Sequence, residues 1–295
     1  MATGTPLVRP AAATRARRAH PHPGRLLIHV ILLATAVLSL FPFALMLLNS
    51  FKSNSEVLRN PAGWPIVFTL DSYREFFSYQ GNAATRSFFN SIFVASVSTA
   101  IAVILAAMAA FAFAKFRFRG RDLIFALLLG TLMVPPEVTL PPLYILFSRL
   151  GWINTYQVQI IPSVASIFGV FMIRQYMLSI PGELLEAARL DGASVWQQFR
   201  LIILPISAPV LGAFAILHFI GRWNDYLWPL IVATKPQVQP IMVLLPTIRD
   251  PVVGFFTPWG MVMAGCVIVT VPLVIVFLLF QDKFVSGTVV GATKG

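Results

Sequence analysis

Residues 186–205 read EAARLDGASVWQQFRLIILP, a stretch dense in charged residues that lies between two long hydrophobic segments. Upstream of it, Pro181 and Glu183 favour a short helix, with Pro181 in the first turn. Proline costs nothing there, and the carboxylates of Glu183 and Glu186 complement the positive end of the helix dipole. Gly192 can take the left-handed conformation that ends a helix. We therefore expect one short helix followed by a sharp turn.

A second helix is expected directly after this turn. Ser194 and Gln197 have the spacing of a capping box, in which each side chain binds the backbone N–H of the other residue. Ala187 and Ala188 give the first helix a small, flat face that a partner could approach closely. We name residues 179–205 the elbow, because the pattern predicts a helix-turn-helix.

The composition is that of an integral membrane protein. Of 295 residues, 57% are hydrophobic and 11% are charged, whereas soluble domains carry about 25% charged residues. The net charge of +11 sits in short segments between hydrophobic runs. That pattern favours orientation in a lipid bilayer, with no nucleic acid as partner. Cys266 is the single cysteine, which excludes a disulfide framework or a thiolate metal set within the chain.

Hydrophobic runs long enough to cross a bilayer predict an all-α, polytopic membrane protein with six transmembrane helices and a cytoplasmic helix-turn-helix coupling loop. The predicted spans are residues 26–48, 88–113, 123–147, 153–173, 206–230 and 260–280. Residues 26–280 then form the transmembrane domain, with the elbow at 179–205 and an outer loop at 231–259. Residues 1–25 form a basic tail that we expect to be disordered and cytoplasmic, and residues 281–295 form a cytoplasmic carboxy-terminal tail.

The orientation follows from one basic cluster. Lys115, Arg117, Arg119 and Arg121 fall within seven residues between the second and third predicted spans. Such a cluster in a short loop marks the cytoplasmic side. Counting spans from it places both chain ends and the elbow in the cytoplasm.

Two sets of residues are candidates for a translocation path. Glu137 is a carboxylate in the proline-rich third predicted span, and it either lines a wet gate or is simply exposed near the outer interface. Trp223, Asn224 and Tyr226 form a polar and aromatic set where the fifth predicted span ends. They either line the path or, with Trp228, anchor the helix in the interfacial aromatic belt. His218 is expected to be a hydrogen-bonded packing residue.

The elbow pattern, EAA followed by DGA and a trailing LP, resembles the EAA loop of binding-protein-dependent ABC transporter permeases. From about Leu26 onward the chain further resembles the carbohydrate subgroup, the maltose-type second permease. The motifs that carry this resemblance are Asn49-Ser50-Phe51-Lys52, Met133-Val134-Pro135-Pro136, Trp223-Asn224-Asp225-Tyr226-Leu227-Trp228-Pro229, and the tail from Phe284-Val285-Ser286-Gly287 to Lys294-Gly295.

The resemblance implies a bacterial-type inner-membrane subunit that imports a sugar. Its partners would be a second permease in a heterodimer, two ATP-binding cassette ATPases and an extracytoplasmic solute-binding protein. The ATPase would be contacted by Glu186, Ala187, Ala188, Asp191, Gly192 and Ala193. In this picture Glu186 pairs with a basic group of the ATPase, and the binding protein would be contacted by Lys235, Arg249 and Asp250. The alternative for the elbow is an amphipathic hairpin that only caps its own bundle.

The chain has no G-x-x-x-x-G-K-[ST] loop, so it lacks the usual phosphate cradle. We expect no bound cofactor, with ATP and Mg used by the partner ATPase. Two other functions make different demands on the sequence. An autonomous, ion-coupled secondary transporter needs buried carboxylates and an internal repeat, and Glu137 is the single candidate. An intramembrane enzyme would need paired catalytic residues, which the sequence does not present.

Overall fold

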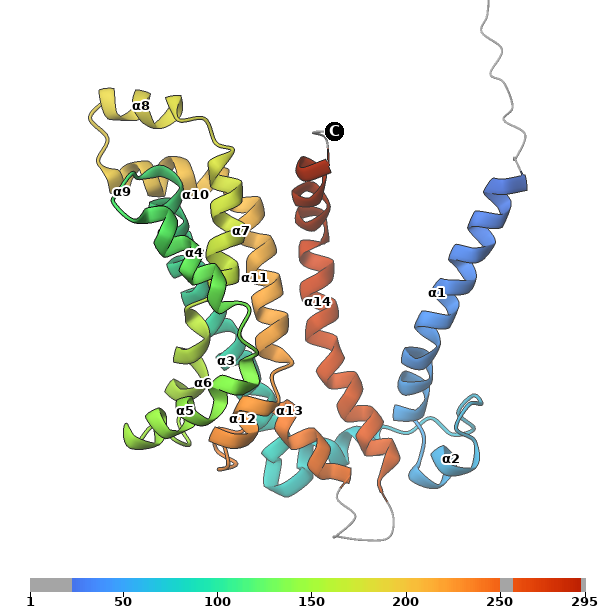
Figure 1. Ribbon diagram of the computed structural model, residues 1–295. Coiled ribbons are helices and arrows are strands. Elements are labelled where there is room, and N and C mark those ends of the chain that lie inside the picture. The colour runs from blue at the N-terminus through green and yellow to red at the C-terminus, as the bar shows by residue number, and fades with distance from the viewer. Residues whose placement is uncertain (1–22, 250–256, 293–295) are drawn as a thin grey trace, which may run out of the picture. The chain divides into compact units, whose positions relative to one another are not determined.

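The computed structural model describes residues 23–249 and 257–292, and within them every regular element is a helix (Figure 1). The elements before the elbow are α1 Pro23–Ser50, α2 Asn54–Arg59, α3 Asp71–Lys115, α4 Arg121–Thr131, α5 Pro136–Arg149, α6 Tyr156–Val164 and α7 Ile167–Leu178. From the elbow onward they are α8 Glu183–Leu190, α9 Val195–Gln197, the π-helix η1 Gln198–Ile203, α10 Leu204–Ile206, α11 Ala208–Trp223, α12 Leu227–Val232, α13 Ile241–Leu244, the 3₁₀ helix η2 Leu245–Arg249 and α14 Trp259–Ala292.

The chain divides into two compact units, Met1–Leu45 and Met46–Gly295. The first unit contains most of α1, whose apolar part Leu27–Ser50 is 24 residues long. At about 1.5 Å per residue it is long enough to cross a bilayer. None of the residues in its most apolar 18-residue window is buried, as expected for a helix that faces lipid or a partner. The first predicted span is thus helical throughout.

The second unit is built around α3, which contains the second predicted span but begins 17 residues earlier, at Asp71. Residues Tyr79–Asn82 leave helical geometry and kink it. After the kink, one face of α3 carries small buried residues, among them Ala95, Ala102 and Ala106. Small side chains allow neighbouring backbones to approach closely in a membrane protein. This face packs against α7 and α11.

The third predicted span, 123–147, is not one continuous helix. It consists of α4 and α5, whose axes differ by 96° at a short break before Pro136. Pro136 opens α5, where its missing N–H is harmless, whereas Pro141 and Pro142 lie inside α5 without ending it. The span is therefore interrupted at Pro135 and Pro136 but not at Pro141 and Pro142.

The remaining spans also differ from the predicted bounds. The fourth starts at Tyr156 rather than at residue 153, and α6 and α7 together form a candidate span, Tyr156–Leu178. The fifth, predicted as 206–230, is divided between α11 and α12. The helix preceding α11 is bent by 76° relative to it. The sixth, α14, continues past residue 280 to Ala292, so most of the predicted carboxy-terminal tail is helical.

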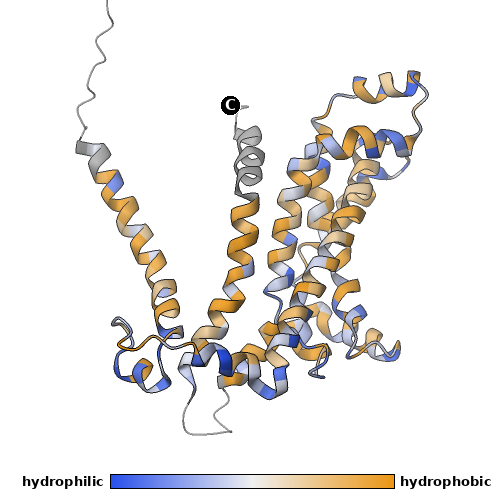
Figure 2. Ribbon diagram, turned by 180° about the vertical axis from the view of Figure 1, so that it is seen from behind, coloured by the Kyte–Doolittle hydropathy of each residue, from blue (hydrophilic) through white to orange (hydrophobic). Residues whose placement is uncertain are grey.

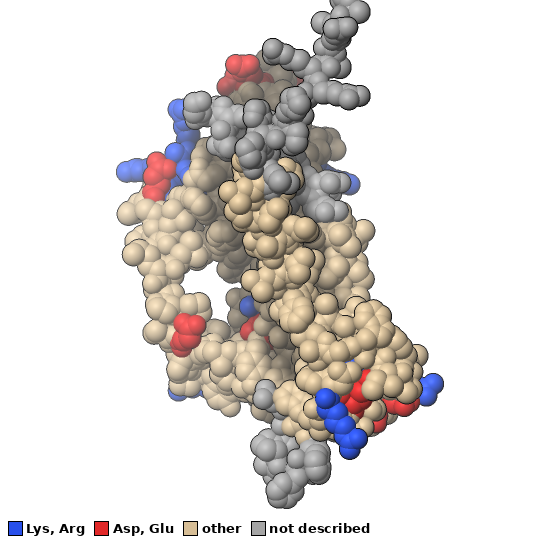
Figure 3. Space-filling view, turned by 90° about the vertical axis from the view of Figure 1, so that its right-hand side faces the viewer, with Lys and Arg blue, Asp and Glu red and all other residues tan. Residues whose placement is uncertain are grey.

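Four helices in the described residues are long and apolar enough to cross a membrane, and six spans result if each bent pair counts as one. Hydrophobic residues dominate the long helices, and hydrophilic residues gather at their connections (Figure 2). Most of the surface visible in the space-filling view carries no Lys, Arg, Asp or Glu (Figure 3). Within the second unit, α8 and α9 lie at one end, and α5, α12 and α13 lie at the other (Figure 1).

Candidate functional site

The first half of the elbow is helix α8, which ends where the sequence predicts. Gly192 has φ of +82°, the left-handed geometry expected after a helix. The start differs from the prediction, because Gly182 caps the helix and Pro181 lies just outside it. Glu183 and Glu186 occupy the first turn and complement the helix dipole there.

The second half of the elbow starts with the predicted capping box. The backbone N–H of Ser194 donates to Gln197 Oε1 at 2.7 Å, and the N–H of Gln197 donates to Ser194 Oγ at 3.3 Å. The helix then passes through the π-helical segment η1 before reaching α10. The sequence did not predict this segment, whose Gln198 is buried and donates from Nε2 to the carbonyl oxygen of Ala193 at 2.9 Å.

Buried apolar side chains hold the elbow against the bundle. Leu185 of α8 and Phe199 and Ile203 of η1 belong to a core cluster with residues of α3, α7 and α11. The ring of Phe199 packs against that of Phe111, with centroids 5.3 Å apart. The elbow is therefore a fixed structure rather than a loose loop.

Two cations join helix ends near the base of the elbow. Lys115 Nζ, at the end of α3, donates to the carbonyl oxygen of Ile180 at 2.6 Å. Arg174 Nε, on α7, donates to the carbonyl oxygen of Phe113 at 3.2 Å, and its guanidinium lies 4.1 Å from the ring centroid of Phe125. Lys115 therefore joins the end of α3 to the elbow, and Arg174 joins α7 to the end of α3 and to α4.

The outer surface of the elbow combines charged and large apolar side chains. Glu186, Ala187, Asp191 and Gly192 are exposed, and Ala188 and Ala193 are half-buried. Large apolar side chains missed by the sequence reasoning are also exposed, among them Leu190 (89%), Val195 (51%), Trp196 (57%) and Leu201 (66%). The sequence could have indicated them, because these apolar residues stand among charged and polar residues of the elbow. Such a rigid, mixed surface is typical of a protein-protein contact.

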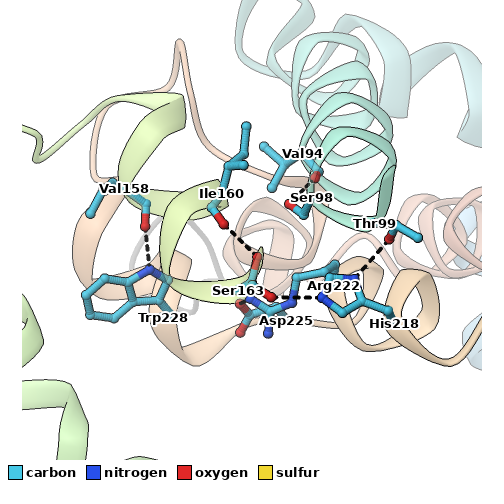
Figure 4. Close-up of polar contacts among 10 residues, drawn as sticks. All are labelled: Val94, Ser98, Thr99, Val158, Ile160, Ser163, His218, Arg222, Asp225 and Trp228. Atoms are coloured by element: carbon cyan, nitrogen blue, oxygen red, sulfur yellow. Dashed lines mark hydrogen bonds and ion pairs between the residues drawn. The ribbon is translucent and has the colours of Figure 1, made fainter. Parts of the chain in front are cut away.

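The polar set near the end of α11 is largely engaged in packing (Figure 4). His218 Nε2 lies 3.0 Å from the carbonyl oxygen of Ser163, which can only accept, so this nitrogen donates. His218 Nδ1 lies 3.1 Å from Thr99 Oγ1. His218 therefore bridges α3, α6 and α11, and the prediction of a hydrogen-bonded packing residue is confirmed.

The two tryptophans of this region are buried as well. Trp223 is 1% exposed and donates from Nε1 to the carbonyl oxygen of Val269, and Trp228 is 6% exposed and donates to that of Val158. An interfacial belt requires contact with the lipid headgroups, so that interpretation is wrong for both residues. Trp223 packs between helices in this conformation rather than facing a path.

The other candidate path residues have different surroundings. Asn224 and Tyr226 are exposed beside a partly buried ion pair, in which Arg222 Nη1 lies 3.1 Å from Asp225 Oδ2. Glu137 is exposed in the first turn of α5, on a different helix from that set.

Of the residues predicted to contact a binding protein, Lys235 is exposed on the connection between α12 and α13. Arg249 is the last residue of η2, and Asp250 lies outside the described residues.

Lys52 is a buried residue whose role the sequence did not reveal. It is 0% exposed, and its Nζ donates to Asn49 Oδ1 at 2.9 Å and to the carbonyl oxygens of Asn60 and Gly63 at 2.7 and 2.8 Å. Its backbone carbonyl accepts from Ser72 Oγ. Lys52 therefore fixes the connection between α1 and α3.

The fold and the elbow define a polytopic helical membrane protein with a rigid polar hairpin inserted between two spans. Residues 99–289 match the family described as the inner membrane component of binding-protein-dependent transport systems. The chain belongs to this family, and it is a permease subunit of an ABC transporter. Such permeases are not catalytic, because separate subunits hydrolyse ATP.

Relatives match over nearly the whole chain. The arabinooligosaccharides transport system permease protein AraQ of Halalkalibacterium halodurans is 35% identical, over 88% of this chain and 93% of the relative. The trehalose/maltose transport system permease protein MalG of Thermococcus litoralis is 36% identical, over 92% and 97%. Nothing in these relatives supports an autonomous ion-coupled transporter.

The fold is similar to that of a chain in a crystal structure of a bacterial ABC transporter involved in import of the acidic polysaccharide alginate. The TM-score is 0.79 at 23% identity, over 88% of this chain and 95% of that chain. The likeness shows a shared fold. It agrees with the all-α, polytopic prediction.

Proposed function

We propose that this permease imports a sugar or oligosaccharide as one half of a heterodimeric channel. A second permease completes the channel, and two ATP-binding cassette subunits drive it with ATP and Mg. The sugar class is supported by the names of the relatives, one for arabinooligosaccharides and one for trehalose and maltose. A solute-binding protein on the outer face delivers the substrate.

The elbow is the proposed contact with an ATPase, and the observation that carries this role is its exposed apolar surface on a rigid base. Leu190 and Trp196 remain exposed although the elbow itself is anchored by buried Leu185. Exposed apolar groups on a fixed hairpin favour burial against a partner. Glu186 then pairs with a basic group of that partner, and Ala187 packs closely against it.

The remaining residues follow from this arrangement. Ala188 and Ala193 keep the flank of the elbow small, and Asp191 and Gly192 form its turn. At the opposite end of the second unit, the connection around Lys235 contacts the binding protein, and Arg249 and Asp250 are proposed to contribute to the same contact. Glu137, Asn224 and Tyr226 are proposed to border the translocation path. Both termini and the elbow lie in the cytoplasm.

The test is co-purification of the tagged chain from its native membrane. Wild type is compared with Glu186→Ala, with Leu190→Asp and with the matched control Glu75→Ala, an exposed carboxylate near the start of α3. We expect an ATPase and a second permease to accompany wild type and the control. Both elbow variants should retain the second permease and lose most of the ATPase.

Two results would contradict the proposal. A wild-type chain that is purified alone and moves solute into vesicles without ATP would show that it needs no motor. Equal recovery of ATPase with all variants would show that the elbow merely caps its own bundle.

A further inference from the structure

A group of five polar side chains holds the loop segment 234–241, which joins α12 to α13, against two other helices. We name this group the clasp. Its members are Asn90 and Ser91 on α3, Asn154 just before α6, and Tyr156 and Gln159 on α6. The loop segment lies in the region proposed above to meet the binding protein.

The contacts from α3 are made by two buried side chains. Asn90 Nδ2 donates to the carbonyl oxygens of Gln237 at 3.0 Å and Gln239 at 3.1 Å. Ser91 Oγ accepts from the backbone N–H of Ile241 at 2.9 Å. Asn90 is 5% exposed and Ser91 is 3% exposed. The bond to Ile241 is buried, so water cannot readily replace it, and breaking it leaves a polar backbone group unsatisfied.

The contacts from the α6 side bind the same segment. Tyr156 Oη donates to Oδ1 of the α3 asparagine at 2.8 Å. Gln159 Nε2 donates to the carbonyl oxygen of Val238 at 3.0 Å. Asn154 Oδ1 accepts from the backbone N–H of Lys235 at 2.8 Å. The clasp thus binds backbone groups along the segment, which fixes its position relative to α3 and α6.

Helix α3 connects the clasp to the elbow without a break. Its non-helical residues, Tyr79–Asn82, all precede Asn90. From Asn90 to Lys115 the helix spans about 37 Å at roughly 1.5 Å per residue. At its far end, Lys115 Nζ donates to the carbonyl oxygen of Ile180, at the start of the elbow. One helix is therefore tied to the loop at one end and to the elbow at the other.

We infer that α3 acts as a rod that transmits the state of loop segment 234–241 to the elbow, with Asn90 as the positioning residue at the loop end and Lys115 at the elbow end. When the binding protein holds the loop, α3 moves with it as a unit and displaces Ile180. This inference rests on the proposed function.

The experiment uses the complete transporter in lipid nanodiscs, with and without its binding protein. Hydrogen exchange of residues 234–241 is measured together with basal and binding-protein-stimulated ATP hydrolysis. For Asn90→Leu we expect exchange of that segment to rise at least about tenfold, because the carbonyl groups of Gln237 and Gln239 lose their donor. Maximal stimulation should fall at least about fivefold, while basal hydrolysis stays within about twofold of wild type.

Three further variants sharpen the test. Tyr156→Phe removes a single hydroxyl group and should give a smaller effect of the same kind. Lys115→Met should lower stimulation equally while leaving exchange of the loop unchanged, because it acts at the other end of the rod. Ser87→Ala is the matched control, because this buried α3 hydroxyl has no hydrogen-bond partner among the described residues. It should behave as wild type.

The outcomes separate the two hypotheses. A wild-type complex without any stimulation would overturn the proposed function. Normal stimulation of both wild type and Asn90→Leu would contradict the proposed role of α3 and leave the proposed function standing. Unchanged exchange in Asn90→Leu would show that the clasp does not hold the loop, and loss of basal hydrolysis in every variant would reduce the clasp to a structural role.

Discussion

The burial of Lys52 makes the strongest prediction at the scale of a single residue. Among the residues that the structure describes, its ammonium group has no acidic partner and instead donates to three oxygen acceptors. The substitution Lys52→Met removes the donor from those acceptors, at about 1–3 kcal/mol for each one that is buried and stays unsatisfied. We expect the midpoint of thermal unfolding to fall by roughly 5 °C or more.

This change can be followed in detergent with a thiol-reactive dye, since Cys266 is the single cysteine and is partly buried in α14. Lys235→Met serves as the control, because Lys235 is exposed and its substitution should leave the midpoint unchanged. Equal midpoints for Lys52→Met and wild type would mean that the network does not stabilise the fold.

The turn of the elbow gives a second prediction at this scale. A side chain at Gly192 would meet no atom within 4 Å, so its positive φ is the one obstacle to substitution. Left-handed geometry costs most residues about 1–2 kcal/mol, whereas asparagine tolerates it. We expect Gly192→Asn to retain the bound ATPase and Gly192→Val to lose much of it. Equal amounts of bound ATPase with both variants would indicate that the left-handed geometry at residue 192 is not needed for the contact.

At the scale of elements, the crossing of α7 and α11 depends on one glycine. A Cβ atom at Gly169 would overlap with the ring of buried Phe214. Overpacking of this kind typically costs about 1–3 kcal/mol. Gly169→Ala should therefore lower thermal stability, and adding Phe214→Leu should recover part of the loss. Gly221→Ala, where a Cβ meets no atom within 4 Å, is the control. Additive effects of the two substitutions would show that the helices do not meet here.

The elements also show how far sequence reasoning reaches. The turn at Gly192 and the capping box of Ser194 and Gln197 were predictable, because their bonding partners lie within three residues. The 96° bend between α4 and α5 was not, since hydropathy measures how long a segment is and not where it points. The clasp was hidden for another reason: Asn90 binds carbonyl groups almost 150 residues away in the chain.

At the scale of the whole molecule, the orientation in the membrane rests on charge. The connection between α3 and α4 carries Arg117 and Arg119, both exposed, beside Lys115 and Arg121. Basic residues in short loops are retained on the cytoplasmic side. With Cys266→Ala as background, Arg119→Cys should react with a membrane-impermeant maleimide only after the cells are permeabilised. Lys235→Cys should react in intact cells.

Each cysteine variant is a control for the other. Arg119 and Lys235 are both exposed in the structure, so burial would not explain a lack of labelling. Labelling of Arg119→Cys in intact cells, with Lys235→Cys protected, would invert the molecule and place the elbow outside, where no ATPase could reach it. Labelling of both in intact cells would place both residues outside, which requires an even number of spans between them. It would then be necessary to treat the bent pair α4 and α5 as a re-entrant segment rather than as one span.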